Sequence, residues 1–346
     1  MKTPPSRGSR HSSATPADPG RFGFLIRTCQ AERGGSLLPP FSFGARPHYE
    51  IVNMKKMLFI YNPRAGKGQI RQKLADILDL FTAGEYEITI VPTRARGDAT
   101  LIVRERAGDV DIVVCCGGDG TLDETVTGLM QGGIRTPVGY IPAGSTNDFG
   151  SSLAIPRDLI EAARRIVIGE DYPVDIGTFN QDVFVYIAAF GAFTEVSYRA
   201  DQNLKNVLGH SAYILEGAKS IPEIRPYHVR LRSGSFETEG NFLYGMVTNS
   251  RSVGGFKGIT GEDVDLGDGE FEVLLVREPR NILETERIFN AFVTRNFEHD
   301  AILRFHAREL ELEFTEDVAW TLDGEDGGMH RKVRIENHRQ AVTLRV

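Results

Sequence analysis

A glycine-rich loop containing one aspartate follows an apolar run near the middle of the chain. The run Val113–Cys116 leads into GGDGT at Gly117–Thr121, and a helical pattern begins directly afterwards. Glycine lets backbone N–H groups approach an anion closely, and the first turn of a helix adds partial positive charge. The loop therefore predicts a phosphate-binding site. The alternative is a tight turn with Asp119 as the helix N-cap, because a bare carboxylate beside an anion needs Mg²⁺ or another compensating group.

Two further loops have the same character. They are YNPRAGKG at residues 61–68 and IPAGSTNDFG at residues 141–150, and each lies between a strand pattern and a helical pattern. The first loop is not a Walker A sequence, because its Gly-Lys pair is followed by Gly68. The carboxyl ends of parallel strands meet at one edge of a sheet, so all three loops would line that edge. Three such loops favour a nucleotide site over simple turns.

Strand and helix patterns alternate through the first part of the chain and would position these loops. Apolar runs predict strands, and apolar residues spaced by three and four predict the helices between them. The expected strands cover 57–61, 86–91, 111–116 and 137–141, and the expected helices cover 70–81, 98–107 and 121–131. This alternation predicts a Rossmann-like α/β domain with a parallel sheet and helices on both faces.

The pattern changes after about residue 150. A helix is expected over 157–168, and two more over 211–221 and 282–294. The remainder reads as strands with few helices between them, and some alternate in polarity along their length. These strands cover 174–179, 183–190, 227–233, 241–250, 271–278, 301–307 and 309–314. The second domain is therefore expected to be mainly an antiparallel β-sandwich.

Length, charge and cysteine content narrow the class of protein. A chain of 346 residues favours two domains, and its net charge of −7 argues against nucleic acid as the main partner. No apolar run reaches about 18 residues, so no transmembrane segment is expected. The three cysteines, Cys29, Cys115 and Cys116, form no disulfide framework, and buried thiols in a reducing cytoplasm are expected.

Residues 1–53 differ from the remainder of the chain. They are rich in Pro, Ser, Gly and Arg and show no hydrophobic period, and no signal peptide is evident. Such a composition predicts a disordered extension. Two alternatives stay open: an organelle transit peptide, and a natural start at Met54, where MKKMLFIYNP opens with basic residues and continues as a strand.

The ordered motifs resemble those of the diacylglycerol kinase catalytic domain family. They are NPRAG at residues 62–66, GGDGT at 117–121 and PAGSTNDF at 142–149. The resemblance covers about residues 57–346 and is nearest to soluble bacterial lipid kinases, which are related to sphingosine kinases and more distantly to NAD kinases. Ser145 departs from the commoner threonine but keeps a hydroxyl group, and Asp98 stands where many relatives carry histidine.

The resemblance implies an ATP site and a catalytic segment. In the family, a carboxylate of a DGE segment is the general base for the lipid hydroxyl, and this segment matches Asp323-Gly324-Glu325. The sequence does not assign the base between Asp323 and Glu325, and a plain turn between strands is the alternative. The implied ATP-binding positions are Asn62, Pro63, Arg64, Ala65, Gly66, Thr93, Gly117, Gly118, Asp119, Gly120, Thr121, Leu122, Asp123 and Ser145.

The segment EDVDLGDGEFEVLLV at residues 262–276 resembles the family's site for a structural Mg²⁺. The resemblance implies that Asp268 supplies its carboxylate, and that the positions of Asp265 and Glu270 supply further ligands through backbone carbonyls. Mg²⁺ prefers such oxygen ligands. An acidic turn with solvated charges is the alternative.

Together these features predict an ATP- and Mg²⁺-dependent lipid kinase that converts diacylglycerol to phosphatidic acid. Residues 54–150 would bind ATP, with a strand at about 335–346 returning to them, and residues 151–334 would bind the lipid in a cleft between the domains. A cytoplasmic protein is expected that visits the membrane transiently, through a basic patch such as Arg225, Arg230 and Arg232, and a homodimer is compatible with the sequence. The alternatives are a kinase for a sphingoid or other lipid or for NAD, and a nucleotide-binding regulator without activity.

Overall fold

The computed structural model describes residues 54–191, 225–254, 256–257 and 264–346. The helix expected at 211–221 and the extension expected at 1–53 lie outside the described residues. Cys115 and Cys116 are buried free thiols, as the sequence predicts.

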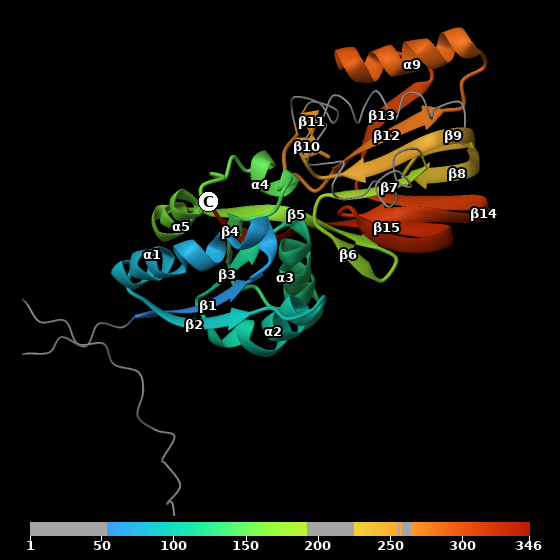
Figure 1. Cartoon of the computed structure of the whole chain (residues 1–346). Helices are drawn as coiled ribbons and strands as arrows, with labels where there is room; N and C mark the ends of the chain where they lie inside the picture. The colour runs from blue at the N-terminus through green and yellow to red at the C-terminus, as the bar shows by residue number, and fades with distance from the viewer. Residues whose placement is uncertain (1–53, 192–224, 255, 258–263) are drawn as a thin grey trace, which may run out of the picture. The chain divides into compact units, whose positions relative to one another are not determined.

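Four parallel strands form the sheet of the N-terminal region (Figure 1). They are β1 (Lys55–Tyr61), β2 (Tyr86–Pro92), β3 (Ile112–Gly117) and β4 (Val138–Pro142). Their order is β4-β3-β1-β2, and every neighbouring pair is parallel. β3 and β4 are buried along their whole length, which explains their continuous apolar sequences. The predicted α/β fold class is confirmed.

Helices connect these strands and pack against the sheet. They are α1 (Ile70–Ala83), α2 (Asp98–Arg106), α3 (Asp119–Gly132), α4 (Asp148–Ser152) and α5 (Leu159–Ile168), with short 3-10 turns η1 (Ala65–Gly68) and η2 (Ala107–Asp109). α5 shows why its residues are helical: the Asp158 carboxylate accepts hydrogen bonds from the N–H groups of Ile160 and Glu161, and apolar residues at spacings of three and four form its buried face.

The C-terminal region is a largely antiparallel sheet. Its strands are β5 (Asp171–Phe179), β6 (Asp182–Phe184), β7 (Ile187–Gly191), β8 (Tyr227–Ser233), β9 (Phe236–Thr248), β12 (Phe271–Arg277), β13 (Ile302–Ala307), β14 (Glu309–Leu322) and β15 (Glu325–Arg345), with a small ladder of β10 (Ser252–Val253) and β11 (Phe256–Lys257). The helix α9 (Ile282–Thr294) matches the expected range. The ring of Phe184 on β6 lies 5.5 Å from that of Phe271 on β12, although these strands are far apart in the sheet order. The sheet therefore curls around a core, which agrees with the predicted sandwich.

β15 is the longest strand and runs through both regions. Its first part pairs antiparallel with β14 and β5, and its last residues pair in parallel with β4, with Leu344 opposite Val138. The register shifts between His338 and Val342, near Gln340 with φ +49°. One continuous backbone thus joins the antiparallel sheet to the parallel one.

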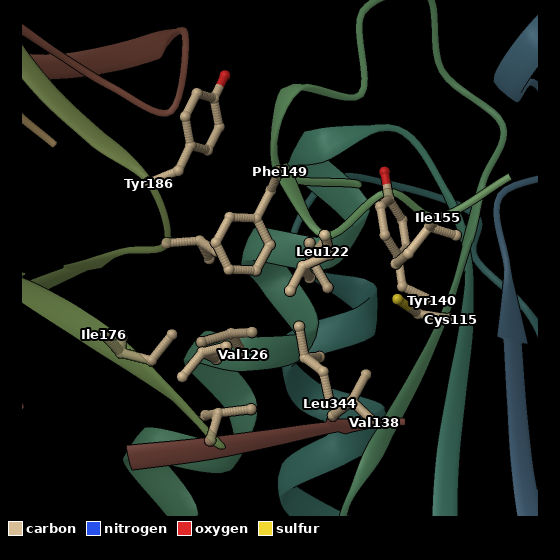
Figure 2. Close-up of a cluster of buried hydrophobic side chains, with 14 of the residues drawn as sticks. Cys115, Leu122, Val126, Val138, Tyr140, Phe149, Ile155, Ile176, Tyr186 and Leu344 are labelled. Atoms are coloured by element: carbon tan, nitrogen blue, oxygen red, sulfur yellow. The ribbon is translucent and has the colours of Figure 1, made fainter. Parts of the chain in front are cut away.

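The buried apolar residues form two clusters. One lies under the glycine loops, where Leu122 and Val126 of α3 pack with Phe149 and Ile176 (Figure 2). The other is formed by residues of the antiparallel sheet around Trp320. The ring of Trp320 lies 4.9 Å from those of both Phe179 and Phe190. Trp320 is therefore a core residue.

Candidate active site

The three glycine-bearing loops meet at the carboxyl edge of the parallel sheet. The N–H of Asn62 after β1 donates to the carbonyl of Cys116 on β3, at 2.8 Å, and the N–H of Ala143 after β4 donates to the carbonyl of Gly117, at 2.7 Å. The N–H of Thr93, after β2, donates to the carbonyl of Tyr61. Because neighbouring parallel strands end together, four chain segments border one small region.

Glycine is required where these loops touch. Gly66 has φ +54°, and a Cβ atom there would collide with the carbonyl oxygen of Ala143. A Cβ atom on Gly144 would lie 2.6 Å from the Cα atom of Gly118. Gly118 itself has φ −85°, and a Cβ atom on it would lie 3.4 Å from the Cα atom of Gly144, which is ordinary contact. The loops therefore pack backbone against backbone, but Gly118 is not needed for that packing.

Asn147 holds the third loop in shape. Its side-chain carbonyl accepts from the N–H of Gly144 at 2.9 Å, and its amide donates to the carbonyl of the same residue at 2.8 Å. The Tyr140 hydroxyl, 3.3 Å from both the Gly117 carbonyl and the Asn147 side chain, links this loop to the end of β3. These bonds fix the conformation of the loop.

Asp119 is the first residue of α3, and its carboxyl group is largely buried. The N-cap of α3 is Gly118, and no side chain caps the helix, so the alternative of Asp119 as an N-cap is wrong. Its Oδ2 atom accepts from the N–H of Asp148 at 3.4 Å, whereas Oδ1 is buried without a partner among the described residues. Burial, followed by the nearby Asp148 carboxylate, raises the pKa of Asp119 to about 7.

Asp148 links the third loop to the C-terminal region. Its Oδ1 atom accepts from the hydroxyl of Ser252 at 2.8 Å, and one turn later the hydroxyl of Ser152 lies 2.8 Å from that of Ser250. All four side chains are buried. A polar contact thus fixes α4 against the segment that contains β10.

The DGE segment is the turn between β14 and β15. Asp323 and Gly324 both have positive φ, +50° and +83°, and Leu322 pairs with Glu325 across the turn. The Asp323 carboxylate accepts from the N–H groups of Val185, Tyr186 and Ile187, at 2.6, 2.9 and 2.9 Å. The segment is a turn, as the alternative proposed, and it is also anchored by one of its two carboxylates.

The two carboxylates of this turn differ in environment. Burial raises the pKa of both Asp323 and Asp123 of α3, and the charge of Asp323 raises that of Asp123 further. The three amide donors stabilise the anion of Asp323 and so oppose the effect of burial on its pKa. Glu325 is half-exposed and lies at the start of α3, where a Cβ atom on Gly120 would be 3.9 Å from its Oε1 atom. Its Oε2 atom lies 3.4 Å from Nη1 of Arg96.

Similarity to known proteins establishes the family. The family model of the diacylglycerol kinase catalytic domain matches residues 56–179. The diacylglycerol kinase of Bacillus subtilis (strain 168) is 35% identical over 279 residues, which cover 80% of this chain and 91% of that protein. The chain belongs to the diacylglycerol kinase family.

Other relatives agree with this membership. The diacylglycerol kinase of Staphylococcus aureus (strain bovine RF122 / ET3-1) is 34% identical, covering 79% of this chain and 87% of that protein. A crystal structure of a diacylglycerol kinase from Bacillus anthracis str. Sterne superposes with a TM-score of 0.73 at 27% identity, covering 85% of this chain and 97% of that chain. The chain is thus a lipid kinase, and membership of a kinase family implies the use of ATP. No helix among the described residues is long and apolar enough to cross a membrane.

Most of the nucleotide-binding residues predicted for this diacylglycerol kinase family member lie on the loops described above, where they would act through their backbone. The side chains of the others differ in burial. Leu122 is a core residue (Figure 2), so its side chain is turned away from the loops, and Thr121 is buried. Arg64 and Ser145 are exposed, and the side-chain oxygen of Asn62 accepts from the N–H of Arg64.

The loop between β2 and α2 contributes a residue that the sequence reasoning missed. The Asp98 carboxylate accepts from the N–H groups of Arg94 and Ala95, and the Glu124 carboxylate of α3 accepts from those of Gly97 and Ala99. These bonds hold Arg96 beside Glu325. The only indication in the sequence that this loop reaches the site was Thr93, a predicted nucleotide-binding residue. Thr93 follows β2, which lies two strands from β3 and its GGDGT loop.

The turn at residues 265–270 is closed by its own side chains. Asp265 accepts from the N–H of Gly267 at 3.1 Å, Asp268 accepts from that of Glu270 at 2.9 Å, and Glu270 pairs with Arg308 at 3.2 Å. Nearby, buried Asp175 accepts from the N–H of Gly269. Within the described part of the kinase, no three acidic, histidine or cysteine side chains gather as metal ligands. The expected set of one carboxylate with backbone carbonyls stays a prediction.

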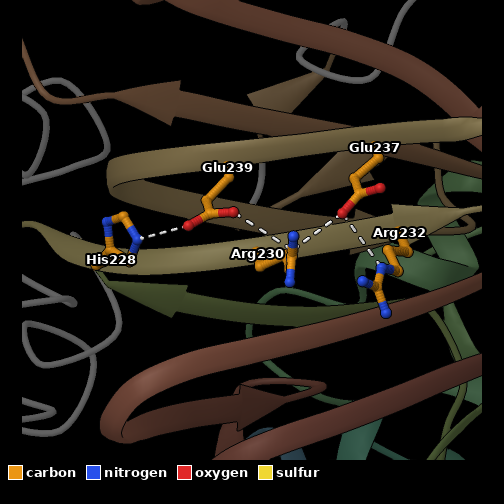
Figure 3. Close-up of polar contacts among 5 residues, drawn as sticks. All are labelled: His228, Arg230, Arg232, Glu237 and Glu239. Carbon is orange, nitrogen blue, oxygen red and sulfur yellow. Dashed lines mark hydrogen bonds and ion pairs between the residues drawn. The ribbon is translucent and has the colours of Figure 1, made fainter.

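The arginines expected to form a basic patch are paired with acids. Arg230 and Arg232 on β8 face Glu237 and Glu239 on β9, with nitrogen–oxygen distances of 2.9 to 3.3 Å, and His228 continues the row (Figure 3). Arg225 pairs with Glu316 at 2.9 Å. The prediction of a basic patch here is wrong, because the antiparallel register places glutamates opposite the arginines.

Proposed function

We propose that the chain is an ATP- and Mg²⁺-dependent kinase that phosphorylates the free hydroxyl group of diacylglycerol, giving phosphatidic acid. The observation that carries this proposal is the position of the DGE turn. A segment about 200 residues after the glycine loops lies against the first turn of α3, with one carboxylate anchored and the other open. In this proposal a phosphate site and a proton acceptor face each other, as phosphoryl transfer to an alcohol requires.

Residues 54–150 supply the nucleotide side of this site. The loop backbones and the N-terminus of α3 would bind the ATP phosphates through N–H groups and the helix dipole. The close approach of Gly66 to Ala143 and the bonds between Gly144 and Asn147 support this role, because they hold the loops in one conformation.

Glu325 is proposed as the general base and Asp323 as a positioning residue. Both oxygens of Asp323 accept backbone hydrogen bonds, whereas the carboxylate of Glu325 is open to a ligand. The lipid hydroxyl oxygen forms a bond to the γ-phosphorus, its proton goes to a Glu325 oxygen, and the bond from that phosphorus to the oxygen of the β-phosphate breaks with its electron pair leaving on ADP.

Magnesium fits this site by its charge. The buried Oδ1 atoms of Asp119 and Asp123 have no hydrogen-bond partner among the described residues, and further negative charge from ATP would be unfavourable there without a cation. Mg²⁺ accompanying ATP would neutralise phosphate charge. A second, structural Mg²⁺ is proposed at the turn of Asp265, Asp268 and Glu270, through the Asp268 carboxylate and backbone carbonyls.

Residues 151–334 are proposed to bind the lipid, with the final strand belonging to the nucleotide half. The acceptor hydroxyl would reach Glu325 from the side of β7, where Ile187 is one of the three residues that anchor the DGE turn. The kinase would visit the membrane transiently to collect its substrate. A homodimer stays a prediction.

An assay with labelled ATP tests the function. The purified protein is incubated with Mg²⁺ and a panel of diacylglycerol, monoacylglycerol, sphingosine, ceramide and NAD. We expect labelled phosphatidic acid, and loss of product when the metal is chelated. Labelling of NAD alone, or of a sphingoid lipid in preference to diacylglycerol, would reject the proposed substrate, and absence of any product with intact ATP binding would indicate a regulator.

Substituting Gly118 tests the phosphate loop. Gly118→Ala should weaken ATP binding by about tenfold or more with little change in melting temperature, because the backbone angles suit alanine but the new methyl group occupies the approach to the loop. Isothermal titration with ATP and thermal unfolding measure the two effects. Gly108→Ala is the matched control, since a Cβ atom there meets nothing within 4 Å. An unchanged ATP dissociation constant would remove this loop from the nucleotide site.

A further inference from the structure

Arg96 is held at the site by backbone hydrogen bonds of its neighbours: those of Arg94 and Ala95 to Asp98 before it, and two after it. The N–H of Gly97 donates to Glu124 Oε1 at 2.7 Å, and that of Ala99 donates to Oε2 at 3.1 Å, which ties the loop to α3. Gly97 has φ +85°, so the chain turns sharply directly after Arg96. The position of this arginine is therefore set by the fold, although its side chain is 74% exposed.

The region around the first turn of α3 has an excess of negative charge. The carboxyl groups of Asp119, Asp123, Asp323 and Glu325 border it. Among the ion pairs of the described residues, only that between Arg96 and Glu325 reaches this group, with Nη1 and Oε2 3.4 Å apart. ATP would add further negative charge to the same region, and a positively charged side chain at this position would offset it.

The contact with Glu325 does not stabilise the fold appreciably. Both side chains are largely exposed, and an exposed ion pair contributes little because water screens the charges. In the resting protein the guanidinium is bound to the group that we propose as the base. This contact occupies an oxygen of the group that must accept the proton, so the pair suits a resting state better than a reacting one.

Building on the proposed function, we propose that Arg96 binds the γ-phosphoryl group of ATP and leaves Glu325 when it does so. A guanidinium offers several N–H donors in one plane, which suits phosphate oxygens. In this arrangement Arg96 stabilises the charge on the transferred group, while Glu325 is released to take the proton of the lipid hydroxyl. The new phosphorus–oxygen bond forms and the bond to the β-phosphate oxygen breaks, with its electrons leaving on ADP.

Comparing ATP with ADP tests this role directly. Arg96→Ala should weaken ATP binding by about tenfold and leave ADP binding unchanged, because ADP lacks the γ-phosphoryl group. In the full chain with Mg²⁺ and diacylglycerol, kcat should fall by about 10²-fold, the typical effect of losing one donor to a charged transition state. Arg96→Lys should recover part of both losses. Arg94→Ala removes an exposed arginine side chain on the same loop that has no proposed role in the site, and it should match the wild type.

Other outcomes would overturn the assignment. Equal changes in ATP and ADP binding would place Arg96 away from the γ-phosphoryl group. Unchanged binding of both nucleotides, with a double variant of Arg96→Ala and Glu325→Gln no slower than Glu325→Gln alone, would mean that Arg96 acts only by positioning Glu325. If the wild type phosphorylated no lipid, the proposed function would fail, while the ATP and ADP titrations would still decide the role of Arg96.

Discussion

Glu325→Gln is expected to lower kcat for diacylglycerol phosphorylation by about 10²- to 10⁴-fold, the range typical of losing a general base. Glutamine keeps the size and hydrogen-bonding shape of glutamate but does not accept a proton at neutral pH. The half-exposed side chain makes no buried contact that the substitution would break, so the melting temperature should stay near that of the wild type. Steady-state kinetics and ATP titration measure the effect, and ATP affinity should change little.

Asp323→Asn separates positioning from chemistry. Asparagine has one acceptor oxygen where Asp323 uses two, so its amide nitrogen would face a backbone N–H and leave a buried donor unpaired. We expect a loss of about 1–3 kcal/mol in the free energy of unfolding, seen as a lower melting temperature. If Glu325→Gln retained wild-type kcat while folded Asp323→Asn lost it, the two roles would have to be exchanged.

Asp119→Asn is expected to stabilise the ligand-free protein at pH 8 by about 1–3 kcal/mol. The pKa of Asp119 rises from 3.8 to about 7 on folding, mainly through burial. This increase in pKa corresponds to about 4 kcal/mol of unfavourable free energy for the charged form, and screening by water at this partly exposed position reduces that energy. The asparagine oxygen still accepts from the N–H of Asp148, so the substitution removes the charge and keeps the contact.

The sign of this effect depends on pH. Because the folded pKa is raised, folded Asp119 holds its proton where the unfolded chain has lost it, so its contribution is most favourable below pH 3.8 and is lost as pH rises to about 7. The advantage of Asp119→Asn should therefore grow between pH 4 and pH 7. Denaturant unfolding at pH 5, 6, 7 and 8 measures it, with Asp79→Asn on the exposed side of α1 as a matched control. An advantage that does not vary with pH would contradict the buried charge.

Local patterns predicted the elements, but contacts between distant segments decided the site. The parallel strands and α9 follow from continuous or periodic apolar residues, which act within a few positions. The different roles of Asp323 and Glu325 depend on amide donors at residues 185–187, more than 130 positions away. Nothing in the sequence Asp323-Gly324-Glu325 indicates these hydrogen bonds, which explains why the sequence alone did not assign the base.

Charge patterns misled where the partner strand was unknown. Arg230 and Arg232 alternate with apolar residues, and that alternation correctly indicates a half-exposed strand. Whether the arginines form a basic surface depends on the strand paired with them, and β9 presents Glu237 and Glu239. Arg96 was missed for the same reason, because its partner Glu325 lies in a turn more than 200 residues later in the chain.

The position of β15 has a consequence for how the chain is made. β4 has β3 on one side and the last residues of β15 on the other, and Val346 exchanges backbone hydrogen bonds with Glu170. Until Leu344 and Arg345 have left the ribosome, β4 is therefore an uncovered apolar edge, the kind of strand that pairs with other chains. The nucleotide half, although encoded first, completes its sheet only after the antiparallel sheet has been made. A chain truncated by its last few residues should aggregate even though all the glycine loops are present.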